Sequence, residues 1–147
     1  MAGAQAPITG RLCAPTDIFA DTFFFLALIN QNDAAHHCAV AYSSTHDDAL
    51  ITTAWVLTEV ANGLARSSQR AVFPRLLAKL RSSPASEVIP PSAELMGRGV
   101  ALYADRADKH WSLTDCISFI VMEDRGIRDA LTGDHHFRQA GFNALLV

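Results

Sequence analysis

Four acidic residues lie far apart in the sequence but at positions where they could act together. Two of them, Asp21 and Asp134, each follow a short stretch that is typical of a β-strand. Asp115 opens an apolar helix, and Glu59 lies on a helix that follows another strand. Carboxylates packed together repel each other and take up protons, unless a divalent cation such as Mg²⁺ or Mn²⁺ is bound between them. Such an ion polarises a phosphoryl oxygen and activates a water molecule for attack, so the set predicts metal-assisted chemistry on a phosphate.

Each of these acids also has an ordinary structural explanation. Asp21 could simply cap a helix, and Asp115 could be the last residue of a capping box. Asp134 stands in a turn, where aspartate is common, and Glu59 could be a solvated residue of an amphipathic helix. The sequence has no Walker loop, Ser-His-Asp motif or zinc motif that would compete with the carboxylate set.

Short strands and helices alternate along the chain. The expected strands cover residues 18–20, 50–53, 87–89, 129–132 and 144–147. The expected helices cover residues 22–29, 34–45, 54–65, 69–80, 93–107, 116–123 and 135–139. Pro74 predicts either a kink in the fourth helix or a later start for it. The alternation indicates an α/β domain with a mostly parallel sheet, whose ligands bind beyond the carboxyl ends of the strands, where Asp21 and Asp134 would meet.

Composition limits the class of protein further. The 147 residues are half hydrophobic and fit one domain, with residues 17–147 as its body and residues 1–16 as a flexible extension. The net charge of −3 argues against binding nucleic acid by overall positive charge, but it is compatible with an acidic, metal-neutralised site beside a local basic patch. Three cysteines without a CxxC pair give no disulfide framework and favour a cytoplasmic location. No apolar run approaches the roughly 20 residues of a membrane helix.

Four motifs give the chain a specific resemblance. They are Asp21-Thr22, the run Leu57-Thr-Glu-Val-Ala-Asn62, the run Trp111-Ser-Leu-Thr-Asp-Cys-Ile-Ser-Phe119, and Leu131-Thr-Gly-Asp-His-His-Phe137 followed by Ala140-Gly-Phe142. In this order and spacing, residues 17–147 resemble the PIN-domain family, specifically the VapC-type toxin ribonucleases. Phe23 departs from the pattern, because small residues are frequent after the first motif.

The resemblance implies a three-layer α/β/α sandwich with a mostly parallel central sheet. It implies a Mg²⁺- or Mn²⁺-dependent endoribonuclease, the toxin of a type II toxin–antitoxin pair, with an RNA substrate, a cognate antitoxin and a homodimeric state. The implied metal ligands and catalytic residues are Asp21, Glu59, Asp115 and Asp134. The implied supporting residues around them are Thr22, Thr114 and Asn62.

Two other classes stay open from the sequence. A non-catalytic PIN-fold RNA-binding or scaffold protein would share the fold, although the presence of all four acids speaks against it. A haloacid-dehalogenase-like phosphatase would need a second acid two residues after Asp21, where the chain has Phe23.

Histidines and cations offer weaker signals. The adjacent pairs His36-His37 and His135-His136 do not predict a zinc site, because neighbours on a helix do not face one direction. His136 is expected to anchor a turn, and His46-Asp47-Asp48 is more typical of a solvated helix end than of a cation site. The five basic residues Arg66, Arg70, Arg75, Lys79 and Arg81 could contact phosphates, although charged faces are usually just solvated.

Overall fold

The computed structural model describes residues 17–45 and 49–147. The expected extension at 1–16 and the group at 46–48 lie outside these described residues. The five strands within the described ranges are β1 (Ile18–Ala20), β2 (Leu50–Thr53), β3 (Ser86–Ile89), β4 (Asp129–Leu131) and β5 (Asn143–Ala144). The helices are α1 (Thr22–Ile29), α2 (His36–Thr45), α3 (Ala54–Leu64), α4 (Val72–Ser82), α5 (Ala93–Asp105), α6 (Leu113–Arg125) and α7 (His135–Gln139).

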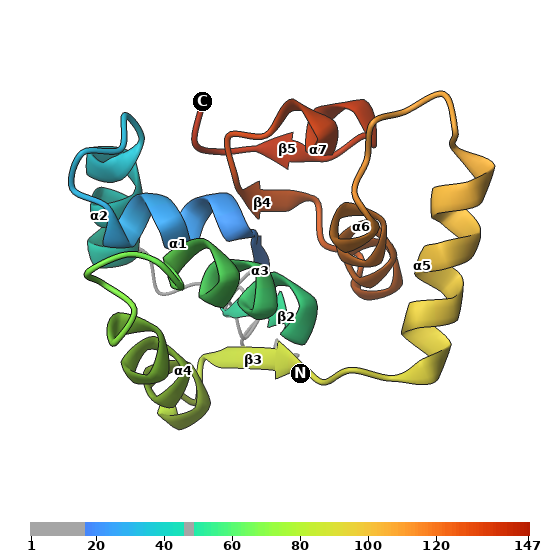
Figure 1. Cartoon of the computed structure of the whole chain (residues 1–147). Coiled ribbons are helices and arrows are strands. Elements are labelled where there is room, and N and C mark those ends of the chain that lie inside the picture. Colours follow the sequence, from blue (N-terminus) through green and yellow to red (C-terminus); the bar gives the residue numbers. More distant parts are fainter. Residues whose placement is uncertain (1–16, 46–48) are drawn as a thin grey trace, which may run out of the picture.

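The strands form one sheet in the order β3-β2-β1-β4-β5, and every pairing is parallel. This confirms the α/β prediction. The chain moves outward from β1 to β3, then crosses back over β1 to reach β4 and β5. Because parallel crossovers are right-handed, this reversal places the helices before β3 and those after it on opposite faces of the sheet. Figure 1 shows α5 and α6 on one side of the molecule and α1, α2 and α4 on the other.

The order of the strands locates the place where a ligand would bind. β1 is the neighbour of both β2 and β4, and the connections that leave β1 and β4 run in opposite directions. A crevice opens at such a switch point, outside the carboxyl ends of the two strands. Asp21 directly follows β1, and Asp134 lies three residues after β4.

An aromatic cluster fixes α6 and α7 against the sheet. The ring of Phe119 lies 5.0 Å from those of Trp111 and Phe137 and 5.7 Å from that of Phe142, measured between centroids. Phe137 in turn lies 6.3 Å from Phe19 of the central strand β1. All five side chains are buried, so the helix that begins beside Asp115 has little freedom to shift.

Two helices begin later than the sequence indicates. Helix α2 starts at His36 because the carboxylate of Asp33 first accepts a hydrogen bond from the Ala35 amide and closes a turn. Helix α4 starts at Val72, which places Pro74 in the first turn, where its missing N–H costs no helical hydrogen bond. Of the two expectations for Pro74, the later start of the helix is therefore the correct one.

The boundaries of α6 and β5 also differ from those expected from the sequence. Helix α6 begins directly after Ser112 and so includes Asp115, three residues earlier than expected. Gly126 ends it in a left-handed conformation, with φ 64°. The final strand is only Asn143–Ala144, although the Leu145 amide still donates to the carbonyl of Ala130 in β4 and the Leu146 amide to that of Thr132 directly after it. No helix among the described residues is long and apolar enough to cross a membrane.

Candidate active site

A pocket of about 490 Å³ opens at the carboxyl ends of β1 and β4. All four acidic residues singled out in the sequence line this pocket. The remaining lining residues are Thr22, Phe23, Leu26, His110, Ser112 and His136. The side chains come from α1, α3, the start of α6 and the start of α7, so the fold brings together residues separated by more than 100 positions.

Asp21 is the most deeply buried of the four acids, with 5% of its surface exposed. It occupies the N-cap position of α1, but its side chain makes no capping hydrogen bond. Instead its Oδ2 accepts a hydrogen bond from the Thr132 hydroxyl at 2.9 Å. The pKa of Asp21 is raised to about 7, mainly by burial. The nearby charges of Asp115 and Glu59 act in the same direction, and hydrogen bonds to the carboxylate act against it. Capping alone therefore does not explain this residue.

Asp115 both caps α6 and lines the acidic pocket. Its amide donates to the Ser112 hydroxyl at 3.0 Å, and its Oδ2 accepts from the Ser112 amide at 3.1 Å, which confirms the capping box. The same Oδ2 lies 3.0 Å from Nδ1 of His136. Burial raises the pKa of Asp115, and the charge of Asp134 acts in the same direction. The cap holds the carboxylate at the pocket wall instead of removing it from the site.

Asp134 caps α7 and is tied to Asp21 through one hydroxyl. Its Oδ1 accepts from the His136 amide at 2.9 Å, and its own amide donates to Oγ1 of Thr132 at 3.0 Å. Since that same Oγ1 donates to Asp21, Thr132 fixes the distance between the two acidic segments. Thr132 is fully buried and was not anticipated as a site residue.

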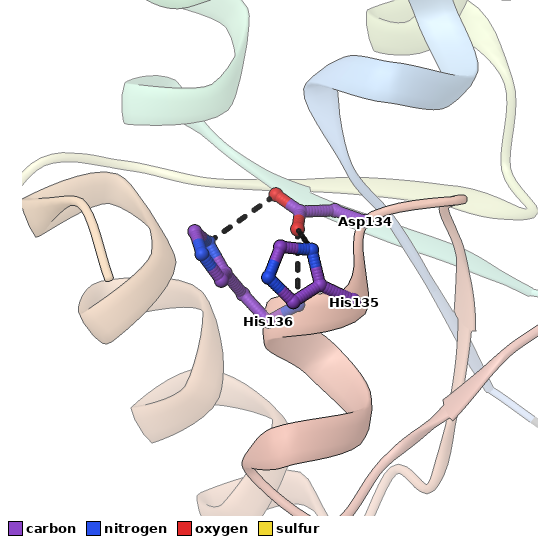
Figure 2. A group of neighbouring side chains, drawn as sticks. All are labelled: Asp134, His135 and His136. Atoms are coloured by element: carbon purple, nitrogen blue, oxygen red, sulfur yellow. Dashed lines mark hydrogen bonds and ion pairs between the residues drawn. The ribbon is translucent and has the colours of Figure 1, made fainter. Parts of the chain in front are cut away.

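Two histidine rings flank the Asp134 carboxylate (Figure 2). Nδ1 of His135 lies 3.5 Å from Oδ1, and Nδ1 of His136 lies 3.5 Å from Oδ2. Among residues 17–45 and 49–147, these three residues are the only trio of His, Cys, Asp or Glu whose ligand atoms all lie within 4.8 Å of one another. Adjacent histidines usually diverge along a helix, but here both stand in the first turn and the N-cap carboxylate folds back between them.

Glu59 completes the pocket from α3. Its Oε2 accepts a hydrogen bond from the Thr22 hydroxyl at 2.8 Å, which links the first turn of α1 to the middle of α3. Thr22 therefore holds a carboxylate in a fixed orientation.

The unusual Phe23 is accommodated by a glycine. A Cβ at position 133 would lie 2.5 Å from the tip of the Phe23 ring, closer than real Cβ contacts allow. The aromatic ring therefore covers the backbone of the turn that leads to Asp134, and it forms one wall of the pocket.

The structure does not bring two of the expected supporting residues into the pocket. Asn62 lines a separate hollow between α3 and α4. It lies three residues after Glu59 on α3, and it shares this hollow with Phe73 and Pro74 of α4. Thr114 is not among the lining residues of the acidic pocket, and its carbonyl accepts a hydrogen bond from Ser118.

The donor chemistry of the pocket suits a hard divalent cation. Carboxylate oxygens are the ligands that Mg²⁺ and Mn²⁺ prefer, and the four acids carry mutually repulsive charge that such an ion would offset. The buried Asp21, with its raised pKa, is the group whose ionised form gains most from a neighbouring cation.

A parallel α/β sheet with acidic side chains gathered at its switch point defines the class of the molecule as a PIN-type domain. The chain belongs to the PIN domain family, whose model matches residues 18–143. This confirms the resemblance drawn from the four motifs.

Individual relatives agree with this assignment. The chain is 32% identical over 126 residues to the 23S rRNA-specific endonuclease VapC20 of Mycobacterium tuberculosis, in strains H37Rv and CDC 1551, and the match covers 85% of this chain and 95% of the relative. The crystal structure of Mycobacterium tuberculosis VapC20, described as a sarcin-ricin loop cleaving toxin, superposes with a TM-score of 0.78 at 29% identity over 86% of this chain and 96% of that one. The crystal structure of FitAcB from Neisseria gonorrhoeae has the same fold, with a TM-score of 0.60 at 18% identity over 87% of this chain and 96% of that one.

Proposed function

We propose that this chain is a Mg²⁺- or Mn²⁺-dependent endoribonuclease. The observation that carries the proposal is the convergence of Asp21, Glu59, Asp115 and Asp134 on one pocket at the switch point of the sheet. A bound divalent ion would polarise the scissile phosphate and lower the pKa of a water molecule. The family to which the chain belongs and the rRNA endonuclease activity of its VapC20 relative support the same reaction.

The residues of the chain would divide the work as follows. Asp21 and Asp115, the two most buried acids, would hold the ion, and Glu59 and Asp134 would act on it directly or through water. Thr132 and Thr22 would keep Asp21 and Glu59 in place through their hydroxyls, while His136 positions Asp115. In-line attack of water breaks one P–O bond and forms another, and the leaving oxygen takes up a proton.

The first substrate to test is the sarcin-ricin loop of 23S rRNA. The similarity to VapC20 extends over 85% of this chain and 95% of the relative, which makes the sarcin-ricin loop the best-supported candidate. Purified ribosomes would be incubated with the protein in Mg²⁺ or Mn²⁺, and new 23S rRNA ends would be mapped by primer extension.

We expect cleavage that is abolished by EDTA and by Asp115→Asn, while the exposed control Asp105→Asn retains it. Cleavage that continues unchanged in excess EDTA would contradict the metal-dependent mechanism. Isothermal titration with Mn²⁺ separates the enzyme from a non-catalytic scaffold, since a scaffold has no need to bind the ion.

The biological setting belongs to the same proposal. As a toxin of a type II pair, the protein would be paired with a small antitoxin, and a ribosomal substrate would place it in the cytoplasm. The homodimer would use α5, where Met96, Val100 and Tyr103 recur at helical spacing and remain 41%, 46% and 55% exposed.

A further inference from the structure

Positive charge is concentrated in one segment of the chain. Between Glu59 and Glu87 the sequence has five basic residues and no acidic one, although acids outnumber bases by fifteen to twelve overall. The five are Arg66, Arg70, Arg75, Lys79 and Arg81, on α4 and on the connection from α3. A chain with a net charge of −3 and an acidic pocket needs such a local positive surface to hold a polyanion.

Ion pairs within the described residues do not neutralise these five cations. All five are exposed, and in the part of the chain that the structure describes none of them forms a salt bridge. Elsewhere Arg98, Arg106 and Arg125 each form a bidentate pair with a carboxylate. The basic segment therefore keeps its charge available to a ligand.

Helix stability explains only part of this segment. Lys79 and Arg81 lie in the last turn of α4, where cations interact favourably with the helix dipole. Arg75 lies near the N-terminus of the same helix, where a cation is locally unfavourable, and Arg66 precedes the helix altogether. Helix stability therefore does not explain why Arg66 and Arg75 are basic.

The segment borders a hollow of about 610 Å³ between α3 and α4. Small side chains line much of this hollow, namely Ala61, Ala65 and Ala71. Polar groups of Asn62, Ser68 and Arg70 and the partly buried ring of Phe73, next to Pro74, complete it. Unpaired bases stack on aromatic side chains while cations track the backbone, and this hollow offers both features side by side.

The hollow lies directly beyond the acidic pocket. Ala61 and Asn62 follow Glu59 within α3, and Arg66 lies in the connection two residues after the end of this helix. The connection is also held in place, because Nε2 of the Gln69 side chain donates to the carbonyl of Ile29 at the end of α1. Arg70 donates to the carbonyl of Ala65 at 2.8 Å, which orders the turn itself.

We infer that the α3–α4 hollow is a nucleotide subsite for unpaired RNA. A base would stack against Phe73, and Arg66, Arg70 and Arg75 would contact the phosphates that flank the scissile one. This inference rests on the proposed ribonuclease function, but it concerns binding and can be measured without cleavage.

The test is binding of a fluorescein-labelled single-stranded RNA to the cleavage-silenced Asp115→Asn protein in Mg²⁺, followed by anisotropy at several salt concentrations. We expect the double variant Arg66→Ala/Arg75→Ala to lower the salt slope by about 1.4, since each single-strand phosphate contact contributes about 0.7. At 0.1 M salt this corresponds to an affinity about 25-fold weaker. The control is Arg125→Ala/Arg128→Ala, which removes two cations that are paired with Glu87 and Glu123 next to the amino end of β4 and should leave the slope unchanged.

Two further variants separate charge from stacking. Arg66→Lys/Arg75→Lys should keep most of the salt slope, whereas Phe73→Leu should weaken binding about fivefold without changing the slope. An Arg66→Ala/Arg75→Ala protein that binds RNA with the slope of its parent would overturn the subsite. RNA binding with the expected slopes but no cleavage by the unsubstituted protein would instead refute the proposed function and leave the subsite standing.

Discussion

Asp21 should make the metal-free protein less stable as the pH rises. Its carboxyl has a pKa of about 7 in the folded protein and close to the ordinary 3.8 when unfolded. The folded state therefore holds the proton more tightly, so the stability linked to Asp21 is fully present below about pH 4 and is lost as the pH rises to about 7. A difference of about 3 pKa units corresponds to about 4 kcal/mol, which is a large part of the free energy of unfolding of an ordinary domain.

The perturbation that tests this reasoning is Asp21→Asn. Asparagine resembles the protonated acid, and its Oδ1 can still accept the hydrogen bond from Thr132. We expect both proteins to have nearly the same free energy of unfolding at pH 4 in EDTA. At pH 8 the variant should be more stable by about 4 kcal/mol, which is the free energy that the unsubstituted protein loses through Asp21 between these pH values.

Urea denaturation at half-unit pH intervals from 4 to 8.5 measures this difference, with the exposed Asp105→Asn as control. At pH 8, Mn²⁺ should raise the free energy of unfolding of the unsubstituted protein, because the ion takes the place of the proton that Asp21 has lost. It should have no such effect on Asp21→Asn, which has no charge at this position. A difference between Asp21→Asn and the unsubstituted protein that does not change with pH would refute the assignment of a buried, proton-binding Asp21.

Three other substitutions test separate parts of the site and its surroundings. Thr132→Val keeps the shape of the side chain but removes the hydroxyl that joins Asp21 to the Asp134 amide, and should weaken Mn²⁺ binding about tenfold in isothermal titration. His136→Ala removes a hydrogen bond that lowers the pKa of Asp115, so the acid limb of the cleavage–pH profile should move to higher pH; an unmoved limb would rule out the positioning role. Tyr103→Glu places a charge in the exposed stripe of α5 and should give a monomer in size-exclusion chromatography with light scattering, whereas a monomeric parent protein would contradict the homodimer.

Local signals made much of the fold predictable from the sequence. The three-residue strand before Asp21 and the capping box that ends at Asp115 depend on neighbours in the chain, so their residue types reveal them directly. Helix boundaries were less predictable where a turn or proline competed with helical periodicity, as before α2 and α4.

The hydrogen bonds between the residues of the site could not be predicted from such local signals in the sequence. The hydrogen bond from Thr132 to Asp21 joins residues 111 positions apart, and the contact of His136 with Asp115 depends on how α6 and α7 pack. No periodicity in a single sequence encodes such contacts. Asn62 lines the hollow beside α4 and not the acidic pocket, and this placement likewise depends on how α3 and α4 pack.

Cations in solution should have opposite effects on the acidic pocket and on the basic hollow. In the proposed mechanism a divalent cation would offset the repulsion among the carboxylates of the pocket, whereas RNA binding at the hollow between α3 and α4 would release cations from the RNA. Mg²⁺ that occupied the pocket would also compete for the phosphates that Arg66 and Arg75 would contact. Asp21 and Asp115 are buried and all four carboxylates are held by hydrogen bonds, while the arginines are exposed, so salt should screen the hollow far more than the pocket. If both proposals hold, raising the ionic strength should weaken RNA binding before it weakens metal binding.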